Sequence, residues 1–138
     1  RGLGDVYKRQ EYARIRPVVN QIEIEPYMTQ HDVVGYTFRK GIQVEAWGPL
    51  GQGVTGVLDD PAIGEIAARH GKSAAQVILR WHMQRGLVTI PRCDNDAYTD
   101  ENIRIFDFEL SSSEMEIITG LNRNQRAYEQ NDPDNFPW

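Results

Sequence analysis

The chain has 138 residues, of which 40% are hydrophobic and 25% charged, a composition typical of one globular domain. Fifteen Lys and Arg against twenty Asp and Glu give a net charge of −5, which argues against nucleic-acid and anionic-membrane partners. The single cysteine, Cys93, excludes an internal disulfide and favours a reducing, cytoplasmic compartment, and no apolar run approaches the ~20 residues of a membrane span.

Hydrophobic periodicity and turn residues predict three strands and five helices. In chain order, the expected elements are a strand at residues 17–24, a helix at 30–40, a strand at 42–47, helices at 61–70 and 74–85, a strand at 87–90, a helix near 100–106 and a helix that begins after Ser111. The glycine-rich residues 48–57 are expected to form a loop. Strands that alternate with helices are typical of a parallel sheet, so the sequence predicts α/β architecture.

Capping residues indicate where four of these helices begin. Thr29 is the expected N-cap of the first helix, and Asp60 followed by Pro61 is expected to open the second. Two capping boxes open later helices, and they pair Ser73 with Gln76 and Ser111 with Glu114.

Titratable residues give weak signals for a site. The three histidines, His31, His70 and His82, share no metal-ligand spacing and are expected at the surface or on helix flanks. Glu23 and Glu25 lie two apart on a strand and so share a face, which allows a paired-carboxylate site, although a solvated or salt-bridged rim is the interpretation that we favour.

The glycine-rich loop permits more than one interpretation. Gly51, Gly53 and Gly56 spell G-x-G-x-x-G after a strand, but the next helix signal comes only at Asp60, so a simple Rossmann motif is disfavoured. Trp47 stands at the C-terminal end of the second strand, the edge where α/β barrels place their chemistry. Because a loop follows it, one face of its ring is expected to be available to a ligand.

Four segments carry a resemblance to a known family: PVVNQIEIEPYMTQ, GIQVEAWGPLGQG, ARHGKSAAQVILRWHMQRGLVTIPR and ENIRIFDFELSSSEM. Together they resemble the C-terminal half of an aldo-keto reductase, in particular the 2,5-diketo-gluconate reductase-like branch. The resemblance implies a (β/α)8 barrel that binds NADPH at its C-terminal face and reduces aldehydes and ketones by hydride transfer, without a metal.

The length of the chain limits what the resemblance implies. A (β/α)8 barrel typically needs about 250 residues, so we expect the C-terminal portion of a TIM barrel, about three of its eight strands, over residues 11–138. Residues 1–10 lack the apolar region of a signal peptide and are expected to be foreign to the family. The family's catalytic Tyr, Lys, Asp and His belong to earlier strands, so no catalytic residue is assigned and the chain alone is expected to be inactive.

The resemblance also implies cofactor contacts. Gln21 corresponds to the glutamine that pairs with the nicotinamide carboxamide, and Trp47 to the aromatic residue that stacks on the nicotinamide. The other implied contacts are Gly48, Pro49, Leu50, Gly51 and Gln52 at the pyrophosphate, Ile90, Pro91, Arg92 and Cys93 at the adenosine 2′-phosphate, and Glu101 and Asn102 at the adenine end.

The 2′-phosphate segment departs from the family pattern. Arg92 replaces a lysine and can still grip phosphate, whereas Cys93 replaces a serine and is a weaker hydrogen-bond donor. Tyr98, the fourteenth implied cofactor contact, stands where the family has an arginine, and Asp94 and Asp96 add negative charge. The resemblance implies NADPH as the cofactor, and these departures make NADH a second candidate.

The expected substrate is a small-molecule carbonyl compound, and the sequence indicates neither its identity nor the oligomeric state. The alternative function is a non-enzymatic nucleotide-binding or structural module of the same fold. Because the family's catalytic positions precede all four of the resembling segments, the sequence does not separate these two functions.

Overall fold

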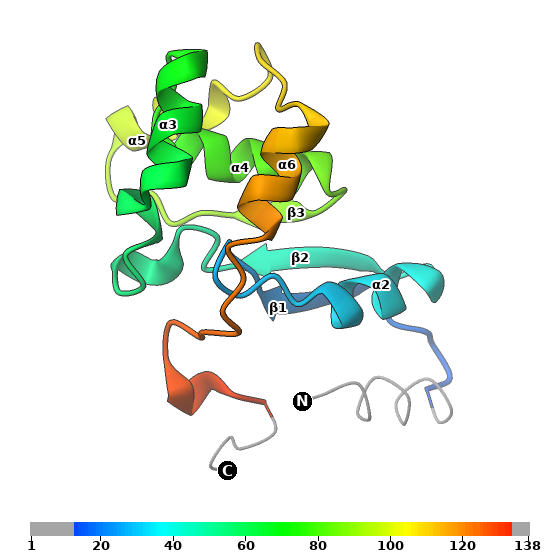
Figure 1. Ribbon diagram of the computed structural model, residues 1–138. Helices are drawn as coiled ribbons and strands as arrows, with labels where there is room; N and C mark the ends of the chain where they lie inside the picture. Colours follow the sequence, from blue (N-terminus) through cyan, green and yellow to red (C-terminus); the bar gives the residue numbers. More distant parts are fainter. Residues whose placement is uncertain (1–12, 134–138) are drawn as a thin grey trace.

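Three parallel strands form the centre of the fold, in the spatial order β1-β2-β3 (Figure 1). Their bounds are Val19–Glu23 for β1, Gln43–Trp47 for β2 and Val88–Ile90 for β3. Trp47 in the central strand lies opposite Glu23 of β1 and Ile90 of β3. The structure is a computed structural model that describes residues 13–133, so the expectation for residues 1–10 lies outside the described range.

Five helices connect and cover these strands in the described part of the chain. They are α2 (His31–Arg39), α3 (Pro61–His70), α4 (Ala74–Gln84), α5 (Asp96–Ile103) and α6 (Ser112–Thr119), with short 3-10 turns η1 (Gly51–Gly53), η2 (Val57–Asp59) and η3 (Glu129–Asn131). Figure 1 shows α3, α4, α5 and α6 gathered on one side of the sheet, with α2 beside β1 and β2. The alternation of strands and helices confirms the predicted α/β class.

The sheet is not closed into a barrel. Among residues 13–133, the outer edges of β1 and β3 have no partner strand. Val44 and Ala46 on one face of β2 have no exposed surface and belong to the core, whereas Gln43, Glu45 and Trp47 on the opposite face are more exposed. An open arc of three parallel strands is what the sequence predicts.

The helix starts that depend on local capping are confirmed. The Asp60 side chain accepts a hydrogen bond from the backbone N–H of Ala62 at 2.9 Å and caps α3. Both predicted capping boxes form, at Ser73 for α4 and at Ser111 for α6. These caps satisfy backbone N–H groups that would otherwise lack a partner at the helix start.

The expected N-cap of α2 is wrong. Gln30, not Thr29, occupies the N-cap position, with a φ of 50°, and it makes no side-chain capping bond. Its side-chain amide instead donates to the backbone carbonyl of Glu23 at 2.9 Å, at the end of β1. The buried Thr29 donates its backbone N–H to Asn122 and accepts from Arg85 through its carbonyl, so tertiary contacts override the local signal.

The helix expected near residues 100–106 begins earlier than predicted. α5 starts at Asp96, because the Asn95 side chain accepts from the backbone N–H of Tyr98 at 3.0 Å and serves as its N-cap. The polar residues Asn95 and Asp96 therefore form the cap and the start of the first turn of this helix.

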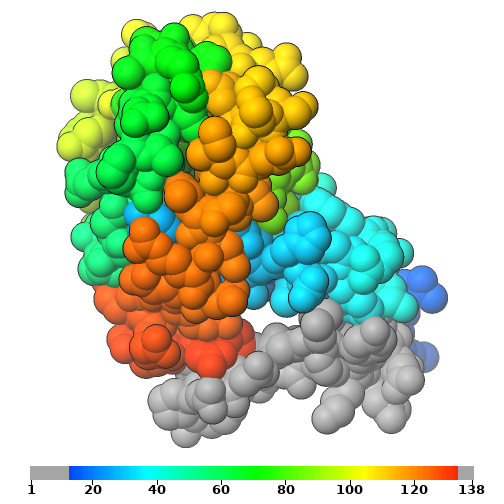
Figure 2. Space-filling model, viewed as in Figure 1, coloured from blue at the N-terminus to red at the C-terminus, as the bar shows by residue number. Residues whose placement is uncertain are grey.

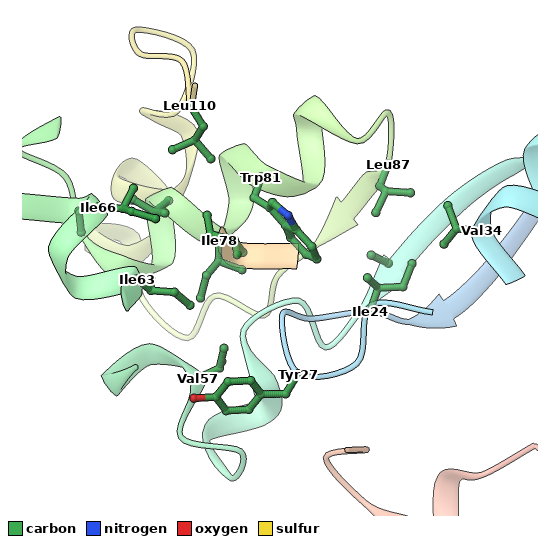
Figure 3. Packing of buried hydrophobic residues seen from close by; sticks show 14 of the residues in the cluster. Ile24, Tyr27, Val34, Val57, Ile63, Ile66, Ile78, Trp81, Leu87 and Leu110 are labelled. Atoms are coloured by element: carbon green, nitrogen blue, oxygen red, sulfur yellow. The ribbon is translucent and has the colours of Figure 1, made fainter. Parts of the chain in front are cut away.

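A core of apolar side chains from β2 and the helices, with Ile24 directly after β1 and Leu87 directly before β3, lies at the centre of the packing (Figure 3). Trp81 of α4 is fully buried there, and its indole N–H donates to the Thr119 hydroxyl at 3.1 Å. Its neighbour His82 is also fully buried, so the expected surface position is wrong for this histidine. The His82 ring nitrogens lie 2.8 and 2.9 Å from the carbonyl oxygens of Ile78 and Ile24, which joins α4 to the end of β1.

Of the solvated or salt-bridged rim expected for Glu23 and Glu25, the solvated part is wrong, since these side chains are 2% and 0% exposed, while the salt bridge is present at Glu23. The chain after α6, which is orange in Figure 2, lies across the end of β1 and covers this region. Within that segment Arg126 forms an ion pair with Glu23 at 3.5 Å, and the backbone N–H of Ala127 donates to the Glu23 carboxylate at 2.6 Å. Glu23 therefore ties the C-terminal segment to the sheet.

Candidate functional site

The loop that follows β2 is held in a tight curl by its glycines. Gly48 and Gly51 have φ values of 59° and 70°, in the left-handed region that disfavours other residues. A Cβ atom at Gly51 would lie 2.0 Å from the Thr55 hydroxyl oxygen, so no larger residue fits without a shift of Thr55. Gly51 begins the turn η1, and its backbone N–H donates to the Gly48 carbonyl at 3.0 Å, which closes the turn.

A cavity of about 630 Å³ opens beside this loop, between the end of β3, the start of α4 and the helix α5. Its volume lies in the range of small-molecule and cofactor sites, roughly 300–1,000 Å³. Ten of the fourteen cofactor-contact residues predicted from the sequence line it, namely Gly48, Pro49, Leu50, Gln52, Ile90, Pro91, Arg92, Tyr98, Glu101 and Asn102. Three chain segments that are distant in sequence thus meet at one site.

The wall of the cavity is built where α4 and α5 meet. The Ser73 hydroxyl donates to the Glu101 carboxylate, and the Gln76 side-chain amide donates to the Glu101 carbonyl at 2.9 Å. The same two residues form the capping box of α4, so one local motif both starts a helix and holds Glu101 in place. Sequence reasoning found the box but missed its position on the cavity wall, which also includes Ala74 and Ala75.

Arg92 is the cation at the outer rim of the cavity. Its side chain is 87% exposed and donates through Nε to the Asp94 carboxylate at 2.8 Å. Asp94 and Tyr98 line the cavity beside it. The exposed Cys93 does not line it, and its sulfur instead accepts from the Asn102 side-chain amide at 3.2 Å.

Gln21 and Trp47 lie outside the cavity, as do Gly51 and Cys93. Trp47 is half-buried at the end of β2, directly before the loop that lines the cavity. Gln21 lies opposite Glu45 in the paired strands, and its side-chain amide donates to the Glu45 carboxylate at 2.5 Å. The structure therefore places ten of the predicted contacts at the cavity, Gln21 and Trp47 on the sheet, and Gly51 and Cys93 at neither.

Four buried polar side chains, Glu23, Glu25, Tyr27 and Asp60, form a cluster that does not line the cavity. The pKa of the Glu25 carboxyl is raised to about 7, mainly by burial and in addition by the nearby Glu23 carboxylate, against the opposing effect of a hydrogen bond from the Tyr27 N–H. The Tyr27 hydroxyl donates to Asp60 at 2.7 Å, and burial together with that carboxylate raises the pKa of Tyr27. Arg123 stacks on the Tyr27 ring at 3.7 Å.

Neither a metal-binding cluster of side chains nor a membrane-spanning helix is found within residues 13–133. No group of three or more His, Cys, Asp or Glu side chains in that range is arranged to hold a metal ion. None of the helices described there has the length and apolar character to cross a membrane.

Comparison with known proteins places these residues in a known sequence family. The family described as Aldo/keto reductase matches residues 3–123. The glyoxal reductase of Bacillus subtilis is 48% identical over 115 residues, which cover 83% of this chain and 41% of that protein. The methylglyoxal reductase DkgA of Salmonella typhimurium is 39% identical over 122 residues, which cover 88% of this chain and 44% of that protein.

Solved structures show the same fold relationship. The crystal structure of a Bombyx mori aldo-keto reductase in complex with NADP is 34% identical and superposes with a TM-score of 0.86, over 97% of this chain and 46% of that one. The chain spans about two fifths of the length of the curated relatives it matches. Its three-stranded sheet accordingly corresponds to part of these larger folds.

Proposed function

The chain belongs to the aldo/keto reductase family, and we propose that it supplies the cofactor-binding part of an NADPH-dependent reductase of small aldehydes and ketones. We place that reductase near the 2,5-diketo-gluconate reductase-like branch, on the four segments that resemble it, and in the cytoplasm, on the single cysteine of the sequence. Its substrates are proposed to be compact carbonyl compounds of the kind that name two relatives, glyoxal and methylglyoxal.

The observation that carries this proposal is the cavity between the loop after β2, the end of β3 and α5. Residues that the family resemblance assigns to a dinucleotide come together there from positions up to 54 apart, Gly48 to Asn102. The site suits an extended diphosphate ligand, because the small residue Gly48 lets a phosphate approach the backbone of the loop and Arg92 offers a guanidinium at the rim.

The sheet edge next to the cavity suits the other end of such a ligand. When bound, the nicotinamide supplies the hydride. Trp47 offers a partly exposed indole face for stacking, and Gln21 offers a side-chain amide on the same sheet face. A dinucleotide that lies over the loop would therefore reach from Arg92 to Trp47.

The proton that completes carbonyl reduction needs a second group. Tyr27 does not suit this role, because its side chain is 3% exposed and its hydroxyl is bonded to Asp60. We propose that the proton donor belongs to a segment of the reductase other than these 138 residues, as the family resemblance implies.

The test compares this chain with a completed barrel, made by joining it to the preceding segment of the Bacillus subtilis glyoxal reductase. NADPH oxidation is followed with glyoxal and methylglyoxal. The completed barrel is expected to turn over, and the 138-residue chain alone is not, because general acid catalysis contributes about 10²–10⁴ in rate.

Turnover by the repurified chain alone would contradict the placement of the proton donor. A folded completed barrel that binds NADPH without reducing any carbonyl would favour the alternative function, a nucleotide-binding module. Arg92→Ala removes the cation at the rim of the cavity, and Arg39→Ala, on the exposed end of α2, is its matched control.

A further inference from the structure

Two polar side chains face each other on the open face of the sheet. Gln21 in β1 and Glu45 in β2 are register partners, and the Gln21 Nε2 atom donates to the Glu45 Oε1 atom at 2.5 Å. Neither side chain has another hydrogen bond to residues 13–133. The pair lies two residues before Trp47 along β2, on the same face of that strand.

The chemistry of the two groups decides which way the amide points. An ionised carboxylate has only acceptors, whereas a glutamine amide has two N–H donors on one atom and acceptor lone pairs on the other. The contact with Glu45 therefore requires the Gln21 NH₂ group to face β2. The Gln21 oxygen is then turned away from β2.

We propose that Glu45 is a positioning residue that fixes the Gln21 amide with its oxygen presented to the ligand. This inference rests on the proposed function, in which Gln21 meets the carboxamide of a nicotinamide. A fixed Gln21 oxygen accepts from the carboxamide NH₂ group and offers nothing to a ring substituent that has only acceptors. Glu45 thus makes the site selective for a carboxamide over an acetyl group of similar shape.

The first test measures the contact itself. Glu45→Gln keeps the shape of the side chain but replaces a pure acceptor with a group that donates or accepts, so the Gln21 amide loses its fixed orientation. In ¹⁵N NMR spectra of the 138-residue chain, the Gln21 side-chain NH₂ signals are expected to shift in Glu45→Gln and to stay in place in Glu65→Gln, an exposed glutamate on α3. Unchanged Gln21 signals in Glu45→Gln would overturn the proposed contact.

The second test measures selectivity, which a purely structural role would not alter. Dissociation constants are compared for NADPH and for its reduced 3-acetylpyridine analogue, whose acetyl group has no N–H donor. The wild-type chain is expected to prefer NADPH by about three- to tenfold, the size of one neutral hydrogen bond. Glu45→Gln is expected to bring this ratio below about twofold, and Glu65→Gln to preserve it.

The outcomes separate this inference from the function on which it rests. An unchanged ratio in Glu45→Gln, with NADPH still bound, would overturn the role of Glu45 and leave the proposed function intact. Failure of the folded wild-type chain to bind either dinucleotide would overturn the proposed function together with the selectivity, while the NMR result would still judge the Glu45 contact.

Discussion

Replacing Asp94 with asparagine should strengthen the preference for NADPH over NADH. Asp94 lines the cavity and holds the Arg92 guanidinium at 2.8 Å, so it competes with a 2′-phosphate for the same cation. Both side chains are more than half exposed, at 87% and 66%, and such ion pairs contribute only about 0–1 kcal/mol. A ligand phosphate can therefore displace Asp94 at small cost.

The size of the preference follows from opposing contributions. A charge-assisted contact between Arg92 and the phosphate is worth roughly 1.5–3 kcal/mol. Repulsion from Asp94 and Asp96, and the lack of a second cation at Tyr98, each oppose it by a few tenths to about 1 kcal/mol. The net preference for NADPH is expected to be about 1–2 kcal/mol, or roughly 5- to 30-fold.

Removing one opposing charge should then have a visible effect. Asp94→Asn is expected to widen the preference by about two- to fivefold, Tyr98→Arg to widen it further, and Arg92→Ala to close or invert it. The assay is kcat/KM for NADPH and NADH in the completed barrel at fixed ionic strength, with Asp32→Asn on α2 as the matched control. A thousandfold preference that survives Arg92→Ala would show that the 2′-phosphate binds elsewhere.

Two further substitutions test the stacking residue and the buried carboxyl. Trp47→Ala should weaken NADPH binding by about 1 kcal/mol or somewhat more, because the indole stacks on the nicotinamide. Phe106→Ala, at an exposed site, is the control and should leave the affinity unchanged. Equal NADPH affinities of Trp47→Ala and the wild type in titration would assign Trp47 to packing alone. Because the pKa of Glu25 is raised from 4.5 to about 7, ionisation of this buried carboxyl destabilises the fold as the pH rises from 4.5 through 7. Because the pKa of His82 is lowered from 6.5 to about 4, protonation of this buried imidazole destabilises the fold as the pH falls below 6.5. Glu25→Gln should therefore gain stability relative to the wild type between pH 5 and pH 8, by at most roughly 3 kcal/mol in chemical denaturation, and a pH-independent difference would contradict the burial argument.

The elements that the sequence predicts correctly depend on neighbouring residues. Asp60 and Ser73 cap helices through bonds to backbone N–H groups two or three residues away, so their patterns are readable locally. Trp47 likewise ends β2 because the following glycine cannot extend the strand in its left-handed conformation. Asn95 follows the same rule, but Asp94 and Asp96 on either side of it are residues typical of turns, which hides the start of α5 in the sequence.

The errors share a dependence on distant parts of the chain. Glu23 is buried by a segment 104 residues later in the sequence, where the Ala127 N–H reaches its carboxylate. His82 is buried because α4 packs on the end of β1 at Ile24. The sequence gives no signal for Glu45, because its contact with Gln21 depends on the register of the two strands.

The central claim is that the cavity beside the loop after β2 binds the dinucleotide. It is tested most directly by mapping NADPH onto the ¹⁵N-labelled chain by NMR. We predict that the largest changes fall at Gly48, Gln52, Arg92 and Asn102 and at the Trp47 indole N–H. Changes confined to other surfaces, or an unchanged spectrum of the folded chain at saturating NADPH, would contradict it.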